Sequence, residues 1–237
     1  MLRLRSRRGP RWRRYGPGDR WPFLLLAGHC RLCAGPAPGP EICAGCRAEL
    51  PWLGPACRTC ALPLVAESLQ CGRCQRRPPP ITRSHALWHY AGQVATLIRA
   101  FKFHGDLAAG RLLADLAAQT LAERVPPPAV LVPMPLHPAR RRERGFDQAL
   151  ELARRLGPPV AADLVRRTRN TAAQSGLDAG ARRRNVRGAF AVTDRPLPPA
   201  ITLVDDVLTT GASARELARA LLAKGVERVD LMVLARA

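Results

Sequence analysis

Eight cysteines in four C-x-x-C pairs constrain this chain more than any other feature of its 237 residues. Two thiolates separated by two residues can bind one tetrahedral Zn²⁺, and two such pairs complete a closed structural site. Nine residues separate the first two pairs and ten the last two, which is enough for a hairpin that returns the second pair to the first. We therefore predict two sequential zinc sites rather than interleaved ones, with the ligands Cys30, Cys33, Cys43 and Cys46 in the first site and Cys57, Cys60, Cys71 and Cys74 in the second.

The main alternative for the cysteines is a disulfide framework. The regular doublets and the lack of a convincing export signal argue against it, and four identical pairs argue against redox catalysis. Two Zn²⁺ ions and eight thiolates would take the net charge of residues 23–80 from +3 to about −1. Such a module lacks the basic surface that phosphate contacts require, so we expect a role in folding or docking, with no zinc position open for catalysis.

The basic charge of the chain is distributed unevenly. The net charge is +20, of which residues 1–22 carry +7 and residues 81–237 carry +10. Almost all basic residues are Arg, a bias as typical of GC-rich coding as of nucleic-acid binding. We expect residues 1–22 to be a disordered basic extension or an over-long start, because the apolar stretch after them is too short for a signal peptide and no small-x-small cleavage site follows.

Composition also bounds the location and the class of the protein. No apolar run approaches the roughly 20 residues of a membrane helix, so we expect no membrane insertion and a cytoplasmic protein. A hydrophobic content of 47% is sufficient for a core. A run of prolines at 78–80 predicts a linker, which divides the chain into a tail at 1–22, a zinc module at 23–80 and a larger domain at 81–237.

The larger domain alternates helix and strand signals. Apolar stripes predict helices around 94–101, 112–116 and 146–153, and apolar runs predict strands at 130–132, 201–204 and 229–234. A further helix is predicted over 213–224, with Ser213 and Glu216 as a capping box and Lys224-Gly225 at its end. The alternation predicts an α/β fold with a mostly parallel sheet flanked by helices.

The most informative segment follows the strand at 201–204. The strand delivers Asp205 and Asp206 to its C-terminal end, and a hydroxyl- and glycine-rich turn then opens a helix whose amides and dipole suit a phosphate. Paired carboxylates would repel a bare phosphate cluster but suit the hydroxyls of a sugar phosphate. The segment resembles the type I phosphoribosyltransferase signature. The resemblance implies that the two aspartates hold the ribose hydroxyls of phosphoribosyl pyrophosphate and that its 5-phosphate is bound by Thr209, Thr210, Gly211, Ala212 and Ser213.

Other stretches narrow the resemblance to the ComF competence family over residues 23–237. The matching stretches are 102–106 and 132–138, together with Arg140, Arg142, Arg144, Gly145, Phe146, Gln148, Arg166, Thr171, Gln174, Leu177, Arg182, Asn185 and Phe190. Ser213 stands where the family usually has Thr and keeps the hydroxyl. Asp147 stands where the family usually has Asn, and we expect its added charge to weaken a contact with pyrophosphate.

The family resemblance implies a pyrophosphate loop at 133–138. Pro133, Met134 and Pro135 would lie against the pyrophosphate, with Arg140 beside them. Lys102 is either a phosphate ligand or a solvated helix end. His137 is either a base or a structural loop residue, and the sequence offers it no visible partner.

The predicted function is Mg²⁺-dependent binding of phosphoribosyl pyrophosphate, with Asp205 and Asp206 as the catalytic pair if transfer to an unknown acceptor occurs. Residues 166–190 could form a lid. The alternatives are a non-catalytic sensor of the same ligand that signals to DNA-uptake proteins, and a zinc-organised protein that binds single-stranded DNA. The excess of arginine leaves room for DNA, but only 5% of residues are aromatic and few lie near the arginine clusters in the sequence.

Overall fold

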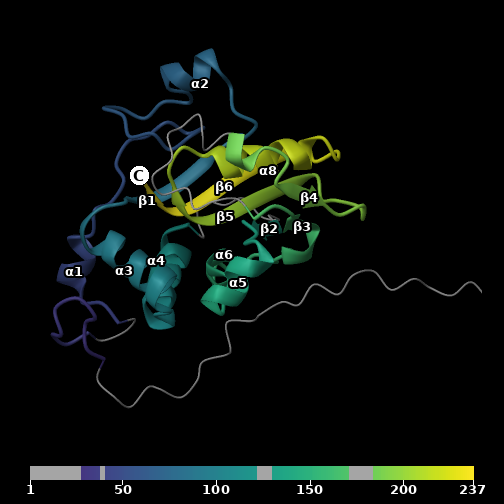
Figure 1. Ribbon diagram of the computed structural model, residues 1–237. Helices are drawn as coiled ribbons and strands as arrows, with labels where there is room; N and C mark the ends of the chain where they lie inside the picture. Colours follow the sequence, from purple (N-terminus) through teal and green to yellow (C-terminus); the bar gives the residue numbers. More distant parts are fainter. Residues whose placement is uncertain (1–27, 38–40, 122–129, 171–183) are drawn as a thin grey trace, which may run out of the picture.

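The computed structural model describes residues 28–37, 41–121, 130–170 and 184–237 (Figure 1). The predicted tail at 1–22 and part of the predicted lid, with Thr171, Gln174, Leu177 and Arg182, lie outside the described residues. The elements in chain order are α1 (Ala44–Ala48), α2 (Gly72–Arg76), β1 (Ser84–His89), α3 (Gly92–His104), α4 (Leu107–Leu121), β2 (Val130–Pro133), α5 (Pro138–Arg144), α6 (Gln148–Ala153), the 3-10 turn η1 (Ala162–Leu164), β3 (Val165–Arg167), β4 (Phe190–Val192), β5 (Ala200–Leu208), α8 (Ala212–Leu222) and β6 (Arg228–Arg236).

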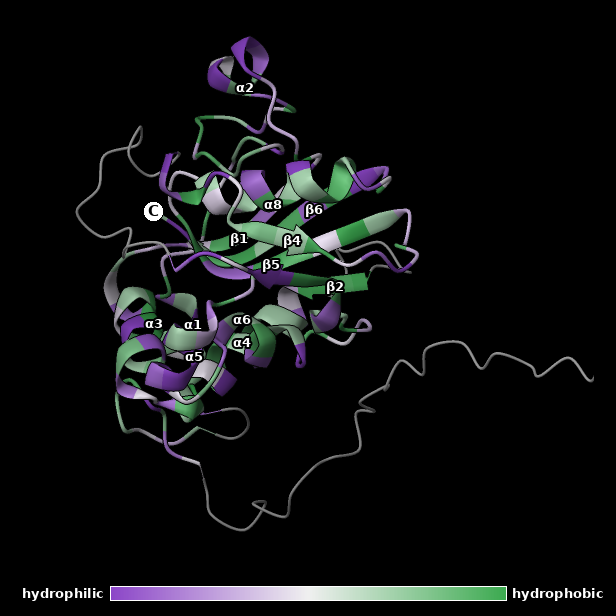
Figure 2. Ribbon diagram, turned by 45° about the vertical axis from the view of Figure 1, so that its right-hand side comes forward, coloured by the Kyte–Doolittle hydropathy of each residue, from purple (hydrophilic) through white to green (hydrophobic). Residues whose placement is uncertain are grey.

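A four-stranded parallel sheet forms the centre of the molecule, with the strand order β1-β6-β5-β2. Its strands are apolar on both faces because helices cover both sides. In β6, Leu231 and Val233 belong to one core cluster, whereas Met232 and Leu234 belong to the other. Figure 2 shows the strands largely in the hydrophobic colour, whereas the helices carry both hydrophobic and hydrophilic segments. The predicted α/β fold with a parallel sheet is confirmed.

Helices α3, α4 and α6 cover one face of the sheet, and α8 covers the other together with the small antiparallel pair β3–β4 (Figure 1). The stripe Val94, Leu97, Ile98 and Phe101 is buried against α4, as its spacing predicts. Within the described ranges no helix is both long enough and apolar enough to cross a bilayer.

The two cysteine-rich units pack against opposite ends of β1. Leu53 N–H donates to the Leu87 carbonyl at 2.7 Å, and the rings of Trp52 and Trp88 lie 5.3 Å apart, so the chain after α1 covers the outer edge of β1. At the start of the same strand, Ser84 Oγ donates to the Thr59 carbonyl at 2.7 Å. β1 has no clear signal in the sequence, and these contacts hold it in place.

The structure corrects two details of the segment around the aspartates. β5 extends through Leu208, so Asp205 and Asp206 lie within the strand rather than after it. The predicted capping box is wrong: Gly211, with φ of 71°, is the N-cap of α8 and Ser213 lies inside the helix. The Glu216 carboxylate instead accepts the Gly188 amide at 2.7 Å, which ties β4 to α8.

Candidate functional site

The eight cysteines form two groups of four, as the spacing predicts. Cys30, Cys33, Cys43 and Cys46 make one group and Cys57, Cys60, Cys71 and Cys74 the other, and within each group the sulfurs lie within 4.8 Å of one another. The Cys33–Cys43 and Cys60–Cys71 sulfur pairs are each 3.8 Å apart, close to the edge of about 3.8 Å of a tetrahedron with Zn–S bonds of ~2.3 Å. None of the eight cysteines forms a disulfide in this structure, and the grouping of their sulfurs confirms the sequential pairing.

The two cysteine groups are built in the same way. Ala34 and Ala61 follow the first C-x-x-C pair of each group in left-handed conformation, with φ of 59° and 52°. In each unit this alanine donates its amide to the carbonyl of the first cysteine at 2.7 Å. Cys43 and Cys71 are then the N-caps of α1 and α2. All four positions of each group offer a cysteine sulfur, so both sites suit a closed structural Zn²⁺.

A separate cavity of about 360 Å³ lies at the carboxyl ends of β2 and β5. From β2 the chain passes to α6 on one face of the sheet, and from β5 it passes to α8 on the other face. Crossovers that leave on opposite faces open a crevice at this edge, where open α/β sheets bind their ligands. The predicted site residues that line the cavity are Lys102, Met134, Pro135, Arg140, Asp205, Asp206, Thr209 and Ser213.

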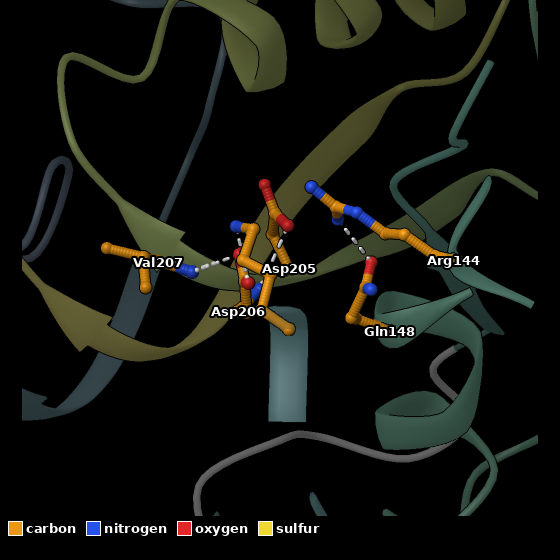
Figure 3. Close-up of polar contacts among 6 residues, drawn as sticks. Arg144, Gln148, Asp205, Asp206 and Val207 are labelled. Atoms are coloured by element: carbon orange, nitrogen blue, oxygen red, sulfur yellow. Dashed lines mark hydrogen bonds and ion pairs between the residues drawn. The ribbon is translucent and has the colours of Figure 1, made fainter. Parts of the chain in front are cut away.

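Asp205 and Asp206 occupy different surroundings within the cavity wall (Figure 3). Asp206 is only 4% exposed, and its two oxygens accept the Val207 amide at 2.8 Å and Lys102 Nζ at 2.6 Å. Asp205 accepts the Asp206 amide at 2.9 Å. Burial, and then the charge of Asp206, raise the pKa of Asp205 to about 7. Asp206 is therefore held in an ion pair with Lys102, whereas Asp205 titrates near neutral pH.

Lys102 reaches the acid pair from the last turn of α3. Burial by itself lowers the pKa of this ammonium group, but Asp206 and Asp205 outweigh burial and raise the pKa above its ordinary value. Lys102 is therefore a charged member of the site, and the alternative of a solvated helix end is wrong.

Two arginines, a phenylalanine and a glutamine in the cavity wall were not among the predicted site residues. Arg144 donates to Gln148 Oε1 at 2.9 Å and points across the cavity toward the aspartates (Figure 3). Its guanidinium also lies over the Phe103 ring at 5.6 Å, and Arg167 lies over Phe190 at 5.5 Å. Burial lowers the pKa of both arginines, yet guanidinium groups stay charged near neutral pH. The arginine-rich stretches at 140–144 and 166–187 were the available signal, but they did not indicate which side chains turn inward.

The predicted phosphate loop is divided between two hollows. Thr209 and Ser213 line the main cavity, whereas Thr210 and Gly211 line a narrow cleft against the second cysteine unit. Thr209 borders both hollows, and Ala212 lines neither. Arg73, Arg215 and Arg236 also line the narrow cleft, so cations adjoin the start of α8 from that side.

The predicted pyrophosphate loop has few backbone amides that are free to bind a phosphate. Pro133 belongs to β2 and is buried, the Met134 amide donates to the Val204 carbonyl at 2.8 Å, and the Leu136 amide donates to Asp147 at 3.4 Å. Asp147 also caps α6 through the Leu150 amide at 3.2 Å, so it positions this loop as well as adding charge. His137 Nδ1 accepts the Ala139 amide at 3.2 Å and caps α5, which is the structural role.

The cavity wall has a mixed but net positive charge. Four cations, Lys102, Arg140, Arg144 and Arg167, face three carboxylates, Asp147, Asp205 and Asp206. Such a wall suits an anionic ligand that also carries hydroxyl donors, because phosphates pair with cations and hydroxyls donate to carboxylates.

Comparisons with known proteins identify a domain family for the cysteine units and relatives over most of the chain. The family model of the double zinc ribbon domain matches residues 23–75. "Competence protein F" of Haemophilus influenzae is 32% identical over 83% of this chain and 90% of its own length. "DNA utilization protein YhgH" of Salmonella typhi is 33% identical over 90% of this chain and 99% of its own. "Competence protein ComFC" of Bacillus subtilis is 29% identical over 79% and 80%.

Proposed function

This chain belongs to the ComF family, which is linked to competence and DNA uptake, and we propose that it binds phosphoribosyl pyrophosphate together with Mg²⁺. The observation that carries the proposal is the meeting of Asp205 and Asp206 with Thr209, Lys102 and Arg140 around one cavity. Its volume of about 360 Å³ is within the range of small-molecule pockets. Phosphoribosyl pyrophosphate combines vicinal hydroxyls with phosphates at both ends, which matches the carboxylates and cations of this wall.

The geometry supports one orientation of the ligand. The ribose hydroxyls would donate to Asp205 and Asp206, and the 5-phosphate would lie at the start of α8, next to Thr209 and Ser213. The pyrophosphate would then extend toward Lys102 and the side of the cavity that carries Arg140, Arg144, Met134 and Pro135. The arginines would supply most of the binding there, because the amides of Met134 and Leu136 already donate hydrogen bonds within the protein.

The carboxylates of the cavity fit a magnesium ion carried by the ligand. Mg²⁺ prefers oxygen ligands and is usually held by one or two carboxylates plus substrate phosphates. Asp206 is engaged by Lys102, whereas no ion pair to Asp205 occurs among the described residues, so Asp205 is the better placed to hold the ion. When bound, the ion would neutralise charge on the pyrophosphate oxygens.

Transfer of the phosphoribosyl group is the reaction that this arrangement suits. The C1–O bond of the ligand would break as pyrophosphate leaves with the electron pair, while an acceptor forms the new bond to C1 and loses its proton. Lys102, Arg140 and Arg144 would stabilise the charge that grows on the departing pyrophosphate.

One observation favours a second candidate, a sensor that binds the same ligand without transfer. His137 is committed to capping α5, and among the described residues that line the cavity there is no histidine to accept a proton from an acceptor. Release of pyrophosphate in the presence of amines or nucleobases distinguishes an enzyme from a sensor.

Calorimetric titration of the full chain with a ligand series tests the binding proposal. Phosphoribosyl pyrophosphate should bind with Mg²⁺ more tightly than ribose 5-phosphate or pyrophosphate alone, because each fragment uses only part of the wall. Equal and weak binding of all three ligands would contradict the proposal.

A further inference from the structure

We propose that Arg236 is a positioning residue that links the second cysteine unit to the predicted phosphate loop at 209–213, so that the zinc site of this unit helps to shape the site for the 5-phosphate. The unit borders the loop across the narrow cleft that Thr210 and Gly211 line. Its four zinc ligands are Cys57, Cys60, Cys71 and Cys74. The inference rests on the proposed function and gives the zinc module a part in ligand binding.

The carbonyl of Leu208 is the point at which Arg236 acts on the loop. Leu208 is the last residue of β5, directly before the loop, and Arg236 is its register partner in β6. Arg236 Nη1 donates to this carbonyl at 2.9 Å, and the Ala237 amide donates to it at 3.0 Å. Because a trans peptide unit is planar, a fixed carbonyl also fixes the direction of the Thr209 N–H group. Arg236 therefore orients the first amide of the loop.

The charges of the narrow cleft connect Arg236 with the second zinc site. The described lining of the cleft contains no carboxylate but three arginines, Arg73, Arg215 and Arg236. Burial lowers the pKa of the Arg236 guanidinium, whereas the charge of Cys60, which lines the same cleft, acts in the opposite direction. A zinc ion with four thiolates has a net charge of about −2, so a loaded site would balance most of the charge of these arginines.

The attachment of the cysteine unit makes this link firm. Ser84 Oγ on β1 donates to the Thr59 carbonyl at 2.7 Å, one residue before Cys60. Arg236 Nε is buried and has no hydrogen-bond partner among the described residues, so one donor remains for the cysteine side of the cleft. Without the metal the thiols would take up protons, and the arginines would then repel one another with no balancing charge in the cleft. We expect this repulsion to loosen the hold of Arg236 on Leu208.

Calorimetry with the full, zinc-loaded chain tests the role of Arg236. The ligands are phosphoribosyl pyrophosphate and pyrophosphate, each with Mg²⁺, because pyrophosphate lacks the 5-phosphate that the loop would hold. Arg236→Met should weaken the binding of phosphoribosyl pyrophosphate at least about fivefold, the contribution of one hydrogen bond, and leave that of pyrophosphate within about twofold of the parent. Arg236→Lys keeps the charge and a donor, and it should recover most of the affinity. The zinc content of both variants, measured by atomic emission, should equal that of the parent.

Arg76→Met is the matched control, because Arg76 is an exposed arginine of the same cysteine unit that does not line the cleft. It should leave both affinities unchanged. A second arm removes the zinc with Cys60→Ser/Cys74→Ser. This variant should also bind phosphoribosyl pyrophosphate more weakly, and adding Arg236→Met to it should cause little further loss, because both changes break the same link.

Equal affinity of the parent and Arg236→Met for phosphoribosyl pyrophosphate would overturn the proposal. An equal loss of both ligands would overturn it as well, since it would indicate damage to the whole site rather than to the loop. Independent losses that multiply in the combined variant would show that the zinc site does not act through Arg236. A parent protein that binds neither ligand would overturn the proposed function together with this inference, which distinguishes the two failures.

Discussion

Asp205 and Asp206 are neighbours in the chain, yet their carboxylates have different electrostatic partners. Asp206 is neutralised by Lys102 at 2.6 Å, whereas Asp205 lies partly buried beside that pair with its pKa raised to about 7. The two residues can therefore have different roles: Asp206 is held in an ion pair with Lys102, and Asp205 changes charge in the physiological range.

The first prediction at this scale concerns pH. Below pH 7 Asp205 takes up a proton and loses the charge that holds Mg²⁺, so the affinity for magnesium phosphoribosyl pyrophosphate should fall as pH decreases through about 7. Titrations from pH 6 to pH 8.5 measure this dependence. The ligand's own phosphates also titrate, so Asp205→Asn is the control. A slope equally steep in Asp205→Asn would show that Asp205 is not the titrating group.

A second prediction concerns the ion pair. Lys102→Met leaves the buried carboxylate of Asp206 without its cation, and we expect the free energy of unfolding in urea to fall by about 2–3 kcal/mol. Adding Asp206→Asn removes the unpaired charge and should restore part of the loss. Lys224→Met is the control, because its partner Asp194 is 92% exposed and the pair should contribute little. Equal effects of the two lysine variants would contradict the assignment of Lys102.

Single residues of the site were predictable where local spacing defines them. Asp205, Asp206 and the hydroxyls of the following turn stand together in the sequence, and they line one cavity except for Thr210. Arg144, Arg167 and Gln148 were not predicted as site residues, because the sequence does not say which side of a short helix or strand faces the sheet edge. Lys102 was recognised only as one of two alternatives, because its partner is distant in the chain.

At the scale of elements, apolar periodicity predicted α3, α4, α6 and most of the parallel strands. It failed for β1, whose sequence has no regular alternation and whose edges are held by backbone bonds to both cysteine units. It also misplaced the start of α8, because Glu216 satisfies the Gly188 amide rather than the end of its own helix. Local capping rules do not include such partners from distant segments.

The packing of α3 against α4 gives a prediction about one glycine. A Cβ on Gly110 would lie 2.4 Å from the ring of Phe101, which is itself buried, so Gly110→Ala should destabilise the protein by about 2 kcal/mol although alanine favours helices. Urea denaturation measures the change. In the control Gly72→Ala the nearest atom is 3.6 Å away, and no loss is expected. A Gly110→Ala variant as stable as the parent would show that the two helices can separate at no cost.

At the scale of the whole molecule, the first cysteine unit shares one core with the α/β domain. Cys30, Ile42 and Leu50 are buried in the same cluster as Trp88 and the helices α3 and α4. The prolines predict a domain boundary near residue 80, and this stays a prediction. The core cluster extends across that position, from the first cysteine unit to the helices of the α/β domain. Zinc binding should therefore stabilise more than the cysteine units themselves.

Removal of the first zinc site tests this coupling. In Cys33→Ser/Cys46→Ser, scanning calorimetry should show a lower melting temperature for the main transition of the full chain, because the shared core loses its support. The parent treated with a zinc chelator should behave in the same way. An unchanged main transition with a separate, earlier one for the cysteine units would show that the two parts are energetically independent.

The paired aspartates and the turn that follows them form the proposed ligand site, and one titration addresses them directly. Calorimetry with phosphoribosyl pyrophosphate and Mg²⁺ should give saturable binding to the parent and at least about a hundredfold weaker binding to Asp205→Asn/Asp206→Asn, since two charge-assisted hydrogen bonds of about 1.5–3 kcal/mol each are lost. Equal affinity of the parent and the folded double variant would contradict it.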